Sequence, residues 1–200
     1  FEDEGRAIVE ADRKSPKLPG AATAVLKHVE HYGMDADGFM RVVLYDLKRV
    51  SGTTDVAQSF YLEQPMIDGR GYPNVLRRRV HKVDGRVLEA AMGDMSQLEK
   101  GDYVEHYLEG YYLPNELGEY TVDTPDLLPE RTSVAEAEIV LRLPESFKAP
   151  FWTHAMLGKP VEEVKGGYRF MRYKLSNLAP RKIEDGLPWL ERGVRISFGT

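Results

Sequence analysis

Short runs of alternating apolar and polar residues dominate the chain, and most of them end at a turn that contains glycine or proline. Alternation places successive side chains on opposite faces of an extended strand. The runs 24–34 and 39–50 flank the sequence DADG at 35–38 and predict a β-hairpin. The runs 74–83 and 86–90 flank DG at 84–85 and predict a second hairpin.

The rest of the chain continues this β-like pattern. Further strands are expected at residues 56–65, 103–113, 133–143, 151–157, 161–164, 166–178 and 194–198. Residues 114–132 lack alternation and predict a long surface connection. Residues 1–20 are rich in charge and end in prolines and a glycine, so they predict a short helix or a linker before a β domain at 21–200. Roughly ten short strands favour a mainly β fold, specifically a two-sheet antiparallel β-sandwich.

Composition narrows the chemistry that the chain can perform. It has 200 residues and no cysteine, which excludes thiol nucleophiles, disulfides and thiolate metal sites. The net charge is −5, with no basic excess of the kind that a nucleic-acid binder shows. No apolar run is long enough to span a membrane. The chain starts at Phe1 without a methionine or a signal peptide, so we expect it to be a piece of a longer protein.

Histidines and paired acids are the candidates for catalysis or metal binding. His28 and His31 are three apart in a predicted strand, so their side chains face opposite sides and do not bind one metal together. His81, His106 and His154 lie in three other strands and converge only if the fold brings them together. The acid pairs, expected to be solvated turns or edges, are Glu99 with Asp102, Glu162 with Glu163, and Glu184 with Asp185. We therefore expect no catalytic residue, cofactor or metal.

Aromatic side chains offer a candidate interaction surface in the run 103–113, formed by Tyr103, Tyr107, Tyr111 and Tyr112. Alternation places Tyr103, Glu105 and Tyr107 on one face of this strand. Exposed aromatic side chains on a sheet can bind sugars or peptides. The alternative is that these tyrosines belong to the core or pack under the 114–133 connection.

The sequences HKVDGRVLEA at 81–90 and LEKGDYVEHYLEGYY at 98–112 resemble a bacterial domain of unknown function that precedes transglutaminase-like domains. The first motif has Val83 where that family has proline, and the second has His106 where it often has tyrosine. The residues that match are Asp84, Gly85, Arg86, Leu98, Glu99, Gly101, Asp102, Val104, Glu105 and Tyr107. The resemblance covers roughly residues 20–200. Glycine tolerates positive φ in tight turns, so we interpret both motifs as architecture.

The resemblance implies a β-sandwich accessory domain of a larger bacterial protein in the periplasm or cell envelope. Catalysis would then belong to a downstream Cys-His-Asp domain, because a chain without cysteine cannot perform thiol acyl transfer. The leading hypothesis is a non-catalytic module that docks the neighbouring domain, a protein or a peptide. A carbohydrate-binding module for cell-wall or surface glycan and a hydrolase that uses histidine and carboxylate groups remain the alternatives.

Overall fold

The computed structural model describes residues 2–21, 23–51, 74–89, 98–112, 114, 118–124, 132–148, 150–180 and 194–199. Over these residues the fold is mainly β, with one α-helix and two sheets, which confirms the predicted class. The strand expected at 56–65 and the pair Glu184 and Asp185 lie outside the described residues. Within the described residues, no helix has the length and apolar character needed to cross a membrane.

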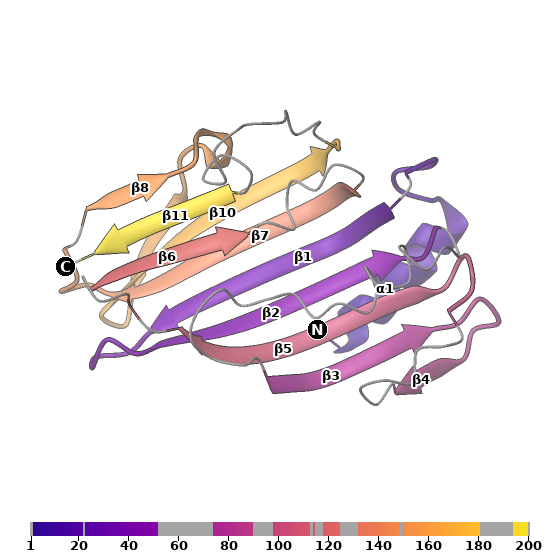
Figure 1. Cartoon of the computed structure of the whole chain (residues 1–200), viewed down its shortest axis with the longest axis horizontal. Helices are drawn as coiled ribbons and strands as arrows, with labels where there is room; N and C mark the ends of the chain where they lie inside the picture. Colours follow the sequence, from indigo (N-terminus) through magenta and orange to yellow (C-terminus); the bar gives the residue numbers. More distant parts are fainter. Residues whose placement is uncertain are drawn as a thin grey trace.

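The larger sheet has eight strands in the order β4-β3-β5-β2-β1-β7-β10-β9, and the smaller has three in the order β6-β11-β8 (Figure 1). In the larger sheet the strands are β1 (Thr23–Met34), β2 (Met40–Arg49), β3 (Asn74–His81), β4 (Val87–Glu89), β5 (Tyr103–Tyr112), β7 (Thr132–Pro144), β9 (Val161–Lys165) and β10 (Tyr168–Leu178). The smaller sheet consists of β6 (Glu119–Thr124), β8 (Phe151–Thr153) and β11 (Val194–Gly199). The helices are α1 (Glu2–Lys14) and the short 3-10 helix η2 (Ala155–Leu157).

Most predicted strands are present, but two segments differ from expectation. The predicted connection 114–132 contains β6, which pairs with β11. The predicted strand 151–157 ends at Thr153, because the His154 side chain accepts a hydrogen bond from the backbone N–H of Met156 and starts η2. A local side-chain hydrogen bond of this kind competes with strand pairing.

The prediction of a purely antiparallel arrangement is wrong for one central pair. β1 runs antiparallel to β2 but parallel to β7, with Thr23 opposite Thr132 and Gly33 opposite Arg142. The chain passes through β2 to β6 before it returns beside β1, so no tight hairpin turn sets the direction of β7. A parallel neighbour requires a long connection of this kind.

Each face of the larger sheet packs against a different partner. On one face, residues of β1, β2, β7 and β10 share a core with Tyr120, Val122, Ile196 and Phe198 of the smaller sheet. On the other face, Val9 of α1 packs against Leu26, Tyr45, Leu47 and Tyr103. Figure 1 shows the smaller sheet in front of the β7 and β10 part, and α1 behind the sheet at its other end. We refer to these as the core face and the helix face.

Candidate functional site

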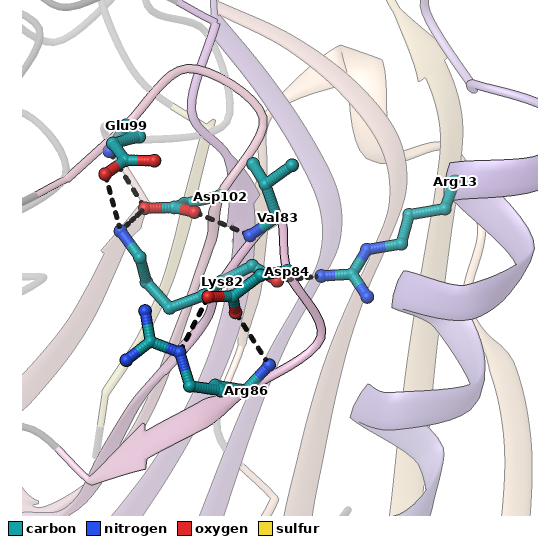
Figure 2. Close-up of polar contacts among 7 residues, drawn as sticks. All are labelled: Arg13, Lys82, Val83, Asp84, Arg86, Glu99 and Asp102. Carbon is teal, nitrogen blue, oxygen red and sulfur yellow. Dashed lines mark hydrogen bonds and ion pairs between the residues drawn. The ribbon is translucent and has the colours of Figure 1, made fainter.

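The motif residues at 81–102 form a cluster around Asp102, whose side chain is 0% exposed. The Asp102 carboxylate accepts hydrogen bonds from Lys82 Nζ at 2.6 Å and from the backbone N–H groups of Val83 at 2.9 Å and Glu99 at 2.8 Å (Figure 2). One carboxylate therefore links the turn after β3 to the turn before β5. The expectation of a solvated Glu99 and Asp102 pair is wrong for Asp102, because it neutralises a buried lysine.

The same cluster contacts the N-terminal helix. Arg13 of α1 donates a hydrogen bond to the carbonyl oxygen of Lys82 at 2.5 Å. Asp84 accepts from both the backbone and the side chain of Arg86, which closes the turn at Gly85, a residue with φ of 92°. These contacts support the interpretation of the motif as architecture: its polar residues are used by turns and by helix attachment.

A row of buried polar residues crosses four strands on the core face. His28 of β1 lies opposite Asp46 of β2, Asp46 lies opposite His106 of β5, and His106 lies opposite Arg78 of β3. All four side chains are buried. The His28 ring nitrogens are 2.8 Å from Glu30 Oε1 and 3.4 Å from Asp46 Oδ1, and Lys48 Nζ is 2.7 Å from Asp46 Oδ2.

The charged side chains of this row change one another's pKa values. Burial alone would lower the pKa of His28, but hydrogen bonds to Asp46 and Glu30 outweigh it and raise the pKa to about 10. Lys48 and His28 overcome the effect of burial on Asp46 and hold the pKa of that carboxyl well below its usual range. Burial and the nearby Lys48 ammonium lower the pKa of His106 to about 3. At neutral pH the row thus holds a cationic His28, an anionic Asp46 and a neutral His106.

A second polar cluster lies on the helix face, under α1. Glu105 Oε2 is 2.9 Å from His81 Nε2 and 3.0 Å from Arg79 Nε, and Glu105 Oε1 accepts a hydrogen bond from the Tyr45 hydroxyl at 3.0 Å. His81 and Arg79 outweigh burial and lower the pKa of Glu105, whereas burial and Glu105 raise the pKa of Tyr45. Gly5 covers this cluster so closely that a Cβ there would collide with the Glu105 carboxylate.

The five histidines that are candidates for a site do not come together in the structure. His28 is buried on the core face and His31 is exposed on the helix face, which confirms that their side chains face opposite sides of the sheet. His106 and His81 lie on opposite faces of the sheet, and His154 caps η2. Across the described part of the chain, no group of three or more histidine or acidic residues could hold a metal ion. Each buried histidine–acid pair lies on one face of the sheet, so the two pairs do not form one site.

The candidate tyrosine surface divides into a buried and an exposed end. Tyr103 is buried, donates a hydrogen bond to Asp12 Oδ2 at 3.0 Å, and has its pKa raised to about 12 by burial and by Asp12. Of the two alternatives for these tyrosines, Tyr103 therefore follows the core alternative. Tyr107 is half-buried, Tyr111 is 57% exposed, and the Tyr112 side chain lies outside the described residues.

Sequence reasoning did not find the buried charges of the core face. Asp46 and Lys48 have the same strand phase as the apolar Val42 and Leu44, so alternation along this strand would place them on the core side. A charge in the apolar phase of a strand is the signal that could have indicated a buried network. Its partners could not be named, because cross-strand register is not visible in one sequence.

Three comparisons relate the chain to known proteins. No protein-family model matches it, and no curated protein matches it. The fold is similar to a crystal structure of a "putative protease" from Parabacteroides distasonis, with a TM-score of 0.71 and 15% sequence identity. That match covers 89% of this chain and 40% of the other, so this chain corresponds to less than half of the longer protein. At this identity the likeness establishes a shared fold.

Proposed function

We propose that the chain is a non-catalytic accessory module of a larger bacterial transglutaminase-like protein of the periplasm or cell envelope. The observation that carries this proposal is the state of the histidine–acid pairs. His28 is buried on the core face, where it contacts Glu30 and Asp46. His81 is buried on the helix face, where it contacts Glu105. A hydrolytic site needs its base within reach of a substrate, so these pairs favour a structural role.

Two further observations support the proposal. The motifs at 81–112 resemble the domain that precedes transglutaminase-like domains, and their polar groups are used within the fold. The similar crystal structure is a longer chain, of which this fold occupies 40%. We infer that the two sheets, which share one core, form an incomplete β-sandwich on the core face, with α1 over part of the helix face. Its exposed surfaces would dock the neighbouring domain, a protein or a peptide.

The test begins with the coding region of the parent gene beyond Thr200. We expect a downstream Cys-His-Asp domain, and we would express that domain joined to this chain. Amide hydrogen exchange of this chain alone and in the joined protein should then differ, with slower exchange in the joined protein around exposed residues such as Tyr111. A reading frame without such a domain, or identical exchange in both proteins, would contradict the accessory role. Hydrolysis by the isolated chain would favour the enzyme alternative.

A glycan-binding module is the second candidate, and one exposed side chain favours it. Trp152 of β8 is 53% exposed and lies on the smaller sheet, away from the α1 contact. Aromatic faces stack on sugar rings. Co-sedimentation with peptidoglycan that is lost in Trp152→Ala but kept in Tyr111→Ala would favour glycan binding, whereas no co-sedimentation would leave the docking role as the better account.

A further inference from the structure

We infer that the part of the helix face that α1 leaves open binds an acidic peptide segment of a partner protein, with Arg142 as its main contact. We call this surface the arginine patch and define it as His31 with Arg41, Arg142 and Arg172. The inference deepens the accessory-module proposal, on which it rests for the kind of partner. It names the chemistry of that partner and the residues that meet it.

Cross-strand register assembles the patch from four strands. Gly33 of β1 lies opposite Arg142 of β7 on one side and opposite Arg41 of β2 on the other, and Arg41 lies opposite Tyr111 of β5. These residues share the strand phase of Tyr45 and Leu47, which contact α1 farther along the sheet. The patch is therefore a continuation of the helix face past the end of the helix.

The next row of the sheet adds His31 and Arg172. Val140 of β7 lies opposite both His31 of β1 and Arg172 of β10. Residues two positions apart in a strand are about 6.6 Å apart and adjacent strands are about 4.8 Å apart, so the long side chains of these two rows can approach one another. Three arginines and a histidine thus cluster on one open surface of a chain whose net charge is −5.

Arg142 differs from the other two arginines because it makes no ion pair within the described residues. Arg41 binds Glu109, and Arg172 Nε is 2.9 Å from Glu138 Oε1. The Arg142 guanidinium carbon instead lies 4.3 Å from the centroid of the Tyr168 ring, and its buried Nε has no hydrogen-bond partner in the described part of the chain. Stacking holds the guanidinium in place, and its charge has no counter-ion among the residues that the structure describes.

The Arg142 side chain also contacts Gly33 of the neighbouring strand. A Cβ at residue 33 would lie 3.5 Å from Arg142 Nε and 3.8 Å from the guanidinium carbon, so the side chain lies directly over the glycine backbone. The guanidinium therefore lies between the backbone of Gly33 and the ring of Tyr168. A fork in a fixed orientation suits a carboxylate, which accepts two parallel N–H hydrogen bonds.

The electrostatic environment of His31 is consistent with anion binding. Desolvation of the imidazole together with the nearby Arg142 and Arg172 lowers the pKa of His31, because a proton on the ring is repelled by these cations. The same positive potential attracts a carboxylate and would weaken as salt is added. A neutral imidazole can donate one hydrogen bond and accept another beside the arginines.

The neighbours of the patch favour a peptide over a small anion. Tyr111 is 57% exposed and Phe39, in the turn that precedes β2, is 55% exposed. Exposed tyrosine and arginine together are typical of protein interfaces, where they provide most of the binding energy. A peptide with acidic residues can reach both Arg142 and these aromatic side chains, whereas a small anion would use Arg142 alone.

The test is an NMR titration of the ¹⁵N-labelled chain with a hexaglutamate peptide, with a hexalysine peptide as the charge-reversed control. We expect hexaglutamate to shift the amides of residues 31–43, 109–111, 140–142 and 168–172, and high salt to abolish the shifts. Arg142→Gln should weaken binding about tenfold or more, the loss expected for a charge-assisted hydrogen bond. Arg142→Lys, which keeps the charge but not the fork, should lie between Arg142→Gln and the wild type.

Arg6→Gln is the matched control, because Arg6 is an exposed arginine of α1 and its loss changes the net charge equally. Equal weakening in Arg6→Gln and Arg142→Gln, or no amide shifts at all, would overturn the inference. Inorganic phosphate that shifts the same amides as strongly would replace it with a small-anion site. Binding to phosphatidylglycerol vesicles without binding to hexaglutamate would replace it with a lipid surface. The titration uses this chain alone, so its failure leaves the downstream-domain test unaffected.

Discussion

Replacement of Asp102 tests whether the 81–112 motif stabilises the fold. Asp102→Ala leaves the buried Lys82 ammonium without the carboxylate at 2.6 Å, and a broken buried ion pair costs about 3–5 kcal/mol. The backbone N–H groups of Val83 and Glu99 also lose their acceptor, at roughly 1–3 kcal/mol each where water cannot replace it. Glu99 is exposed, so water can replace the lost acceptor at that turn and reduce this cost. We therefore expect the free energy of unfolding to fall by at least about 4 kcal/mol in total, a large fraction of the ~5–15 kcal/mol of a typical domain.

The assay is equilibrium urea denaturation followed by far-UV circular dichroism. Lys82→Met in the Asp102→Ala background removes the buried ammonium and should recover part of the loss, so the double-mutant cycle separates the ion pair from the backbone hydrogen bonds. Asp84→Ala is the matched control, because Asp84 belongs to the same motif but is exposed. We expect Asp84→Ala to unfold at the same urea concentration as the wild type. A loss below about 1 kcal/mol for Asp102→Ala, or equal losses at both aspartates, would refute the architectural interpretation.

Two more predictions concern α1 and pH. Gly5→Ala places a Cβ against the Glu105 carboxylate and 2.7 Å from the Tyr45 hydroxyl, so we expect a net loss of about 1–2 kcal/mol despite the better helix propensity of alanine, measured by urea denaturation. Stability should be greatest between about pH 6 and 7. The pKa of His28 is raised, so its contribution to the free energy of unfolding is complete below pH 6.5 and is lost as the pH rises toward 10. The pKa of His106 is lowered, so the protein loses stability as the pH falls from 6.5 toward 3. Each contributes at most about 1.4 kcal/mol per pH unit, checked by thermal unfolding across this range.

Each of these predictions has an internal control. Arg6→Ala changes an exposed position next to Gly5 and should leave the midpoint unchanged, so an equal loss there would refute the steric argument. His106→Leu removes the ring whose two nitrogens have no partner among the described residues, and should flatten the acid side of the pH profile without affecting the alkaline side. An unchanged acid side in His106→Leu would show that other groups, such as Asp46, set the acid limit.

Alternation and turn chemistry predicted the strands well because both are local. The hairpin of β1 and β2 follows directly from DADG between two alternating runs, and Arg77, Arg78 and Arg79 divide between the two faces as their spacing requires. Non-local features were not predictable from one sequence. The placement of β7 beside β1, the burial of Tyr103 under α1, and the meeting of His28, Asp46 and His106 all depend on register between distant segments. The arginine patch was missed for the same reason, since its residues come from the four strands β1, β2, β7 and β10.

The parallel pairing of β1 with β7 has a consequence for the order of folding. β1 is synthesised before β7, and β2 can pair with one edge of β1 at once. The other edge of β1 stays unpaired until residues 132–142 have been synthesised. Contacts that join such distant segments slow folding, and an unpaired strand edge is open to pairing with other chains. During synthesis, β1 is therefore the point at which this protein is most exposed to misassembly. A product truncated before β7 should aggregate through that edge.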